Sequence, residues 1–516
     1  MKQYIKNLAH FKGFLGHLIV CSVLSVLIVG CDQTPLPQTK IKIEKKIPTE
    51  LNRAIYSAYI QLDPHFIKVA ADAAPVRDLF LGLMRFDPKG NIINGVAESY
   101  KTQDSKHWVF KIRNDVIWSN GEPVTADDFV ESWKRLLDPR ESSPLAQYLI
   151  YMGLENAKEI FNGTKPLDDL GIHALNSQIL QIDLKEPNQQ LPKMLAHVAL
   201  LPTYHGKKPE DSNQIIVNGD YEVISREINT ITLHSRKENN AFKTVKYQLI
   251  GTAQNPDRFD IIENPLKGYR RNIIKLPQLC TYFYEFNFND SNLSKKEIRQ
   301  AIRAMVSSSD ISKGFGIPDY SVLPSTMTSE IGYQLSSHSA EQFFEQLGLK
   351  EKNILHIKIT FDNEGKHEEI ANRIARTLGQ SDLFRVTLDP VSWESLLKKR
   401  DSKNFQLIRS GWCADYNDPV LFLNQFHSTS LDNKSGYSNS IVDEKLEKLK
   451  ISLLTEEERD SLILEIIKQL EEDVAILPLF QYQRRVSVAP DIVGVDKDNT
   501  SEVIYSKDLY RNKEEG

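Results

Sequence analysis

The sequence predicts a mixed α/β fold in which strands and helices alternate along the chain. Apolar and polar residues alternate from Leu355 to Phe361, the pattern of a strand with one buried face. Ile370, Ile374 and Leu378 then recur at helical spacing. A strand followed directly by an amphipathic helix is typical of α/β architecture.

Three further elements support this fold class. Alternating apolar residues predict a strand over 245–249. Asn218-Gly219 lies between two short apolar segments, which predicts the turn of a hairpin. Thr455 and Glu458 form the sequence pattern of a capping box, and the apolar residues that follow at helical spacing predict a long helix.

The composition excludes several classes of protein. The chain has 516 residues, of which 41% are hydrophobic and 26% charged, values typical of a globular protein and not of a disordered one. The net charge of −5 argues against a nucleic-acid binder, which would carry a basic excess. The mean hydropathy of −0.38 excludes a protein with many membrane spans.

The N-terminus has the layout of an export signal. Residues 1–30 contain three lysines, no acid and an apolar stretch over 18–29. The stretch ends in a segment that resembles a bacterial lipobox, so we expect a cleaved signal peptide, a lipid on Cys31 and a tether over 31–48. Asp32 resembles the residue that keeps some lipoproteins at the inner membrane. The alternative is an uncleaved anchor; both place the chain outside the cytoplasm, attached to a membrane.

The cysteines divide according to this interpretation. Cys21 lies in the signal and Cys31 would carry the lipid. Cys280 and Cys413 remain as an even pair in an exported protein, which permits a disulfide. Two unpaired buried cysteines are the alternative.

Motifs for catalysis are missing from the sequence. It contains no His-Glu-x-x-His, no G-x-S-x-G, no phosphate-binding G-x-x-x-x-G-K and no paired C-x-x-C. We therefore expect no metal and no cofactor, and we expect a binding protein, not an enzyme. A catalytic site assembled from distant residues stays the alternative.

Several ordered segments resemble family 5 of the extracellular solute-binding proteins of ABC transporters, in particular its oligopeptide-binding members. The resemblance runs from about Leu51 almost to the C-terminus. It rests on the segments 61–65, 77–83, 118–129, 279–287 and 411–419, which include Trp118-Ser119-Asn120-Gly121-Glu122-Pro123 and Gly411-Trp412-Cys413-Ala414-Asp415-Tyr416.

The resemblance implies a type II-like periplasmic-binding-protein fold, with two lobes and an extra inserted domain. The expected domains are lobe I over 49–80, 205–279 and 491–516, an inserted domain II over 81–204, and lobe III over 280–490. Ligand would close the lobes by a hinge motion.

The resemblance also implies the roles of charged residues. Asp415 matches the position that pairs with the ammonium of a peptide. Arg409 and His367 match positions that bind a ligand carboxylate, and Arg400 matches another basic pocket residue. The Arg guanidinium suits a carboxylate because it donates two parallel hydrogen bonds.

Other matched positions would hold the rest of a peptide. Trp393 and Trp412 fit walls of side-chain pockets. The backbone of an extended ligand would pair as an added strand. The expected partners in that pairing are Gly411, Trp412 and Cys413 on one side and Lys68, Val69 and Ala70 on the other. In this family a Cys280–Cys413 bridge would fix the ligand strand to its neighbour.

The function implied is a lipid-anchored, monomeric receptor in the periplasm or cell envelope, which binds short peptides and delivers them to the permease of an ABC importer. One alternative is a narrower ligand, such as a murein (cell-wall) peptide, a dipeptide or another small solute. A second alternative, from another class, is an extracellular peptidase or chaperone-like protein.

Overall fold

The structure is a computed structural model. It describes residues 48–68, 70–209, 214–251, 255–327, 340–346, 348, 354–451 and 454–512. The predicted signal peptide, Cys31 and the tether up to residue 47 lie outside the described residues.

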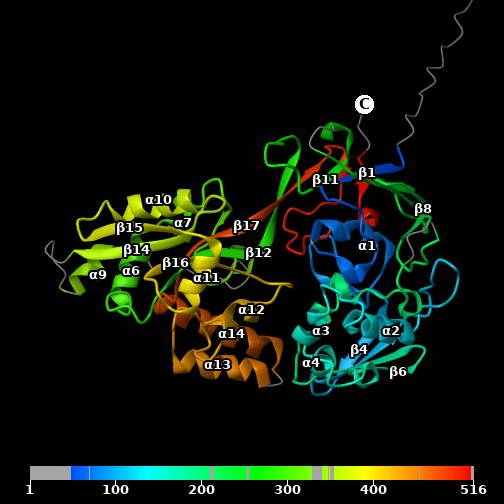
Figure 1. The fold of residues 1–516 in the computed structure, drawn as a ribbon, viewed down its shortest axis with the longest axis horizontal. Helices are drawn as coiled ribbons and strands as arrows, with labels where there is room; N and C mark the ends of the chain where they lie inside the picture. Colours follow the sequence, from blue (N-terminus) through cyan, green and yellow to red (C-terminus); the bar gives the residue numbers. More distant parts are fainter. Residues whose placement is uncertain are drawn as a thin grey trace, which may run out of the picture. The chain divides into compact units, whose positions relative to one another are not determined.

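A large mixed sheet of eleven strands organises the described residues (Figure 1). Its strand order is β15-β14-β16-β12-β17-β11-β1-β10-β9-β8, with β13 paired to β17. The strands are β1 (Glu50–Ile55), β8 (Tyr221–Arg226), β9 (Thr230–Ser235), β10 (Thr244–Leu249), β11 (Ile261–Glu263), β12 (Ile273–Phe286), β13 (Ile317–Pro318), β14 (Leu355–Asp362), β15 (Phe384–Val391), β16 (Leu407–Cys413) and β17 (Ile476–Val488).

Strands β12 and β17 are the longest in the sheet, and they connect two hydrophobic cores. Leu276 and Val486 belong to the core that surrounds β1 and β10. Tyr282 and Leu479, further along the same two strands, belong to a second core built with β14 and β16. The chain therefore has two lobes, each with its own core, joined by paired strands.

The predicted strand–helix unit is confirmed. β14 pairs in parallel with β15, and the helix α10 (His367–Leu378) lies between them in sequence. Ile370, Ile374 and Leu378 are all buried on α10. The strand predicted over 245–249 is also confirmed as part of β10.

The first lobe carries a separate four-stranded sheet, with the order β4-β5-β7-β6. Trp118 and Trp133 are fully buried in the core next to it. The elements of this region are β2 (Met84–Phe86), β3 (Ile92–Asn94), β4 (Ala97–Thr102), β5 (His107–Ile112), β6 (Ile172–Asn176), β7 (Ile179–Asp183), α2 (Ala126–Leu137), α3 (Gln147–Tyr151), α4 (Ala157–Phe161) and α5 (Leu191–Met194), with α1 (Ala74–Leu79) before it.

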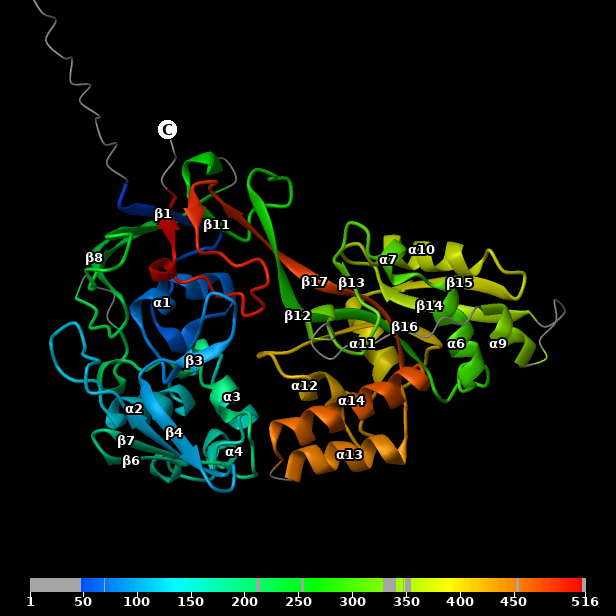
Figure 2. The same cartoon turned by 180° about the vertical axis from the view of Figure 1, so that it is seen from behind.

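In the second lobe, the predicted capping box is confirmed at the start of α14. Thr455 Oγ1 accepts from the Glu458 backbone N–H at 3.3 Å, and Glu458 Oε2 accepts from the Thr455 N–H at 2.9 Å. α14 packs beside α13, as Figures 1 and 2 show. The helices of this lobe are α6 (Lys296–Met305), α7 (Ser308–Ile311), α9 (Ala340–Gln346), α11 (Trp393–Asp401), α12 (Val420–Leu423), α13 (Ser440–Ile451) and α14 (Glu456–Glu472).

Short elements complete the chain. A two-stranded sheet near the C-terminus pairs β18 (Ile492–Val493) with β19 (Tyr510–Arg511). The 3-10 helices are η1 (Pro64–Phe66), η2 (Ala70–Ala73), η3 (Leu167–Asp169), η4 (Val198–Leu200), η5 (Tyr204–Gly206), η6 (Pro256–Arg258), η7 (Asn424–Phe426) and η8 (Ser506–Asp508).

The hairpin predicted at Asn218-Gly219 is wrong. The described residues 214–218 form no strand, and β8 pairs with β9 through a turn that follows Arg226. Asn218 instead accepts from the Leu81 N–H and donates to the Leu81 carbonyl, both at 2.9 Å. A Cβ at Gly219 would lie 2.5 Å from the Asp78 carbonyl oxygen, so this glycine serves a close approach of two segments.

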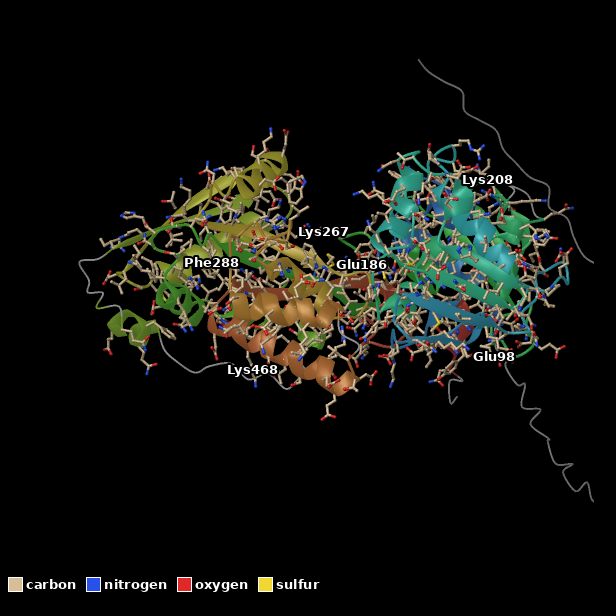
Figure 3. The ribbon with its side chains drawn as sticks, turned by 90° about the horizontal axis from the view of Figure 1, so that it is seen from below. Glu98, Glu186, Lys208, Lys267, Phe288 and Lys468 are labelled. Carbon is tan, nitrogen blue, oxygen red and sulfur yellow. A yellow bond between two sulfur atoms is a disulfide. The ribbon has the colours of Figure 1, made fainter. Side chains whose placement is uncertain are left out.

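Among the described residues, no helix is long and apolar enough to cross a membrane. Figure 3 shows the side chains on this framework, with Glu98 on β4 and Lys468 on α14.

Candidate functional site

Strand β16 has an open edge over its C-terminal half. On one side it pairs with β12 along its whole length. On the other side β14 pairs only with Leu407 and Ile408. Within the part of the chain that the structure describes, no strand pairs with that side of residues 409–413. This leaves room for one more strand, the arrangement that extended peptides use when they bind by main-chain hydrogen bonds.

The ladder determines which backbone groups face this edge. In an antiparallel pair, alternate residues bond to the partner strand and the residues between them point away. The Ala414 N–H donates to the Leu279 carbonyl of the neighbouring strand at 2.8 Å. Cys413 and Gly411 are therefore the residues whose N–H and C=O groups point to the open edge.

Gly411 has a structural reason to be glycine. A Cβ at this position would lie 2.7 Å from the Thr281 carbonyl oxygen, which is closer than a side chain tolerates. Glycine therefore allows the close pairing of β16 with β12 at this position, and Gly411 itself is exposed.

A disulfide ties the end of the open edge to β12. Cys280 and Cys413 lie directly opposite each other in the β12–β16 ladder, with a Cα–Cα distance of 4.0 Å, and their sulfurs are bonded. The two residues are 133 positions apart in sequence. The bridge fixes the position of the loop that begins at Ala414.

Asp415 lies in that loop and faces a cavity of about 250 Å³. Its carboxylate makes no hydrogen bond or ion pair with any other described residue. The side chain keeps access to solvent, yet the surrounding cavity walls displace enough water to raise the pKa of its carboxyl above the usual value. A charged group that is partly desolvated and unpaired can bind a group of opposite charge.

The loop itself is fixed by a different acid. Asp418 accepts from Arg459 Nη2 at 2.7 Å through both carboxylate oxygens. Lys193, on α5, donates to the Asn417 carbonyl at 3.2 Å and lies 3.4 Å from Asp418 Oδ2. Asp415 is therefore held in place without using its own carboxylate.

Residues of the first lobe complete this cavity, and the sequence analysis missed them. Tyr148 and His197 stack with ring centroids 3.9 Å apart, and Arg77 lies on the same wall. Burial, with a smaller contribution from the charge of Arg77, lowers the pKa of His197 to about 3, so this ring is neutral. The two rings are 49 positions apart on different elements, and no local sequence pattern links them.

The expected contacts from the first lobe are described only in part. Lys68 is exposed and lines the cavity of Asp415. Val69 lies outside the described residues. Ala70 begins the 3-10 helix η2, and the pairing of a ligand backbone with this segment stays a prediction.

A second cavity, of about 390 Å³, follows the open edge of β16. Gly411, Trp412 and Cys413 line it from the strand. Trp393, at the start of α11, closes it from the side and is 44% exposed. The predicted aromatic wall is therefore assembled beside the predicted ligand strand.

Arg409 and His367 lie together at the far end of β16. Both approach Asp362, with nitrogen–oxygen distances of 3.5 Å. His367 Nδ1 is 3.1 Å from the Tyr282 hydroxyl. The Arg409 guanidinium lies over the rings of Tyr282 and Trp393, at 5.3 and 5.6 Å. Burial and the positive charge of Arg409 lower the pKa of His367, whereas Arg409 stays charged.

Arg400 is close to the second cavity but is already paired. It donates to both carboxylate oxygens of Glu285, at 3.0 and 2.6 Å, and Ser410 donates to the same carboxylate at 3.0 Å. Arg400 thus lines the second cavity, and its guanidinium is paired with Glu285. Direct contact between Arg400 and a ligand stays a prediction.

Comparison with known proteins gives consistent matches. Residues 91–434 match the sequence profile of the bacterial extracellular solute-binding proteins, family 5. A Haemophilus influenzae protein described only as a binding protein is 38% identical over 499 residues, covering 94% of this chain and 95% of its own. The periplasmic oligopeptide-binding protein OppA of Salmonella typhimurium is 29% identical, covering 96% of this chain and 98% of its own.

A solved structure shares the fold. The unliganded open form of the periplasmic murein tripeptide binding protein MppA superposes with a TM-score of 0.83 and 27% identity, over 90% of this chain and 97% of its own. The expected two-lobed, type II-like α/β fold is thereby confirmed. With a profile match over more than half of its length, this chain belongs to the bacterial extracellular solute-binding proteins of family 5.

Proposed function

We propose that this protein is an extracytoplasmic receptor for short peptides that delivers them to the permease of an ABC importer. The observation that carries the proposal is the open edge of β16, which runs from Arg409 to the unpaired carboxylate of Asp415. An extended peptide pairing with this edge would place its ammonium at Asp415. Main-chain pairing gives affinity that depends little on sequence.

The distance between the two charges limits the length of the ligand. Six positions separate Arg409 from Asp415, and extended chain covers at most about 20 Å over six residues. The two side chains and the terminal groups of the ligand take up part of this length. A peptide of about three to five residues therefore fits between them.

The cellular setting belongs to the same proposal. Residues 1–30 would be removed as a signal peptide, Cys31 would carry the lipid, and 31–48 would be the tether to the membrane in the periplasm or cell envelope. The receptor would be a monomer that binds peptides without cleaving them. Lobe I (49–80, 205–279 and 491–516) with domain II (81–204) would close on lobe III (280–490) around the ligand.

A narrower ligand is the second candidate. A cell-wall peptide is this candidate, because the murein tripeptide binding protein superposes on this chain in its unliganded open form with a TM-score of 0.83. Both candidates would bind the ligand ammonium at Asp415. They differ in the chemical groups that the site near Arg409 must accept.

Native mass spectrometry of the chain after Cys31 tests the proposal. The purified protein should carry adducts with the masses of a few amino acids, and mixed tripeptides should exchange with them. A single mass that matches a wall fragment would select the murein candidate. Absence of any adduct, together with no shift on adding tripeptides, would contradict peptide binding.

A further inference from the structure

A third cavity, of about 710 Å³, carries a charge opposite to that of the whole protein. Six lysine and arginine side chains line it together with His367, and none of its lining residues is acidic. The chain as a whole has a net charge of −5. We call this space the basic cavity; its cations are Lys267, Arg270, Lys275, Lys366, Arg409 and Arg485.

Most of this charge has no carboxylate partner. Asp362 lies near Arg409, and Glu369 lies 3.5 Å from Lys366. The structure describes no ion pair for the other four cations, Lys267, Arg270, Lys275 and Arg485.

Arg485 shows why the charge stays uncompensated. Its guanidinium donates to the backbone carbonyls of Leu266, Lys267 and Tyr269. These bonds fix the neighbouring loop on β17 but neutralise no charge. Several cations brought together in a concave space repel one another, and an anion entering the space relieves that repulsion.

The basic cavity joins the proposed peptide site at Arg409. This residue lines both the basic cavity and the cavity along the open edge of β16. A peptide that runs along the edge from Asp415 would reach Arg409 with its C-terminal end. Acidic groups at that end would enter the basic cavity.

The remaining wall of the cavity is aromatic. Tyr282 and Phe480 stack with centroids 4.7 Å apart, and Phe315 stacks on Phe480 at 5.9 Å. The methylene groups of an acidic side chain can pack on this wall while its carboxylate meets the cations.

We propose that the receptor selects peptides whose C-terminal end carries additional carboxylates, and that the basic cavity is the site of this selection. The inference rests on the proposed function, because it takes the direction of the ligand from Asp415. It adds a preference for acidic ligands that main-chain pairing alone does not give.

Calorimetry with matched peptides tests the selection. Wild-type protein should bind Ala-Ala-Ala-Glu at least about tenfold more tightly than Ala-Ala-Ala-Gln, with a preference that shrinks as salt is added. In the double variant Lys267→Gln, Arg270→Gln the preference should fall to about threefold or less, because Ala-Ala-Ala-Glu loses more affinity than Ala-Ala-Ala-Gln does. The double variant Lys448→Gln, Lys468→Gln removes two exposed charges elsewhere and should keep the wild-type preference.

Three outcomes would overturn the inference, and they can be told apart. Equal affinity for the two peptides would reject the selection and leave the proposed function standing. Failure of both peptides to bind would reject the proposed function as well. Tight binding of citrate alone, with no preference among peptides, would assign the cavity to a free anion.

Discussion

Two groups of charges at the cavity of Asp415 differ in how their charge is compensated: a buried cluster around Glu263, and the carboxylate of Asp415 itself. Arg53 is fully buried and donates to Glu263 at 2.5 Å and to Ser506 Oγ at 2.8 Å. Arg484 pairs with the other oxygen of Glu263. Asp415, in contrast, has no partner in the described residues.

The comparison separates charges that stabilise the fold from a charge that the proposed function assigns to ligand binding. Removing one member of a buried pair leaves an uncompensated charge, which is strongly destabilising. Removing an unpaired carboxylate relieves a desolvated charge and should cost no stability. Replacing a carboxylate should therefore lower the free energy of unfolding in the buried cluster and should not lower it at Asp415.

The largest effect is expected at the buried cluster. Glu263→Gln leaves Arg484 without a carboxylate partner in the described residues and leaves Arg53 with Asp78 alone, 3.9 Å away, and should lower the free energy of unfolding by about 3–5 kcal/mol. Urea unfolding measures this change in the free energy of unfolding. Glu98→Gln, which removes an exposed pair with Lys111, should change stability by less than about 1 kcal/mol. Equal effects at the two sites would contradict the assignment of the cluster to stability.

Removing the disulfide should have the second-largest effect on stability. The double variant Cys280→Ser, Cys413→Ser releases a bridge between residues 133 positions apart and should lose about 2–4 kcal/mol in urea unfolding. Wild-type protein treated with reductant should match the variant. If reductant has no effect on wild-type unfolding, the two cysteines are not bridged in the purified protein.

Gly411→Ala should have an intermediate effect on the ligand edge. The new Cβ meets the Thr281 carbonyl, so β16 must shift, at a cost of about 1–3 kcal/mol. Thermal unfolding and peptide affinity should both decline. Gly251→Ala is a matched control, because a Cβ there meets nothing within 4 Å. A variant at Gly411 that unfolds and binds as wild type does would show that the edge tolerates a side chain.

The smallest effect concerns pH. Burial raises the pKa of Asp415, so the unliganded protein binds this proton more readily than the unfolded chain does. As pH falls through the raised pKa, this group should stabilise the free protein and weaken peptide binding, by up to about tenfold per pH unit.

The pH effect is measured as the difference between wild type and Asp415→Asn. Other buried carboxyls, such as Asp78 and Asp319, also have raised pKa values and cancel in this difference. An affinity difference between the two proteins that does not change with pH would exclude an ionised Asp415 as the ammonium partner.

The fold was predictable from sequence where the pattern is local. The β14–α10 unit follows from alternation and helical spacing over two adjacent segments. The hairpin predicted at Asn218-Gly219 was wrong because a contact with Leu81, far away in sequence, determines the geometry there. No local sequence pattern indicates that contact.

The site was predictable only through the resemblance, and only in part. Of the matched positions, Arg409 on β16 and Asp415 in the loop after β16 both line cavities. Arg400 also matched a position of the family's pocket, but its guanidinium is hydrogen-bonded to Glu285. The basic cavity escaped the sequence analysis because Lys267 and Arg485 meet there from segments far apart in the chain.

The most direct test of the central claim combines two changes at the ammonium site. Calorimetry would compare Ala-Ala-Ala with its N-acetylated form on wild type, on Asp415→Asn and on the control Asp382→Asn, which removes an exposed carboxylate that lines none of the three cavities. Acetylation and Asp415→Asn should each cost about 3 kcal/mol, and the second change should add little once the first is made. The control should behave as wild type does. Additive losses, or undiminished binding by Asp415→Asn, would contradict the pairing of Asp415 with the ligand ammonium.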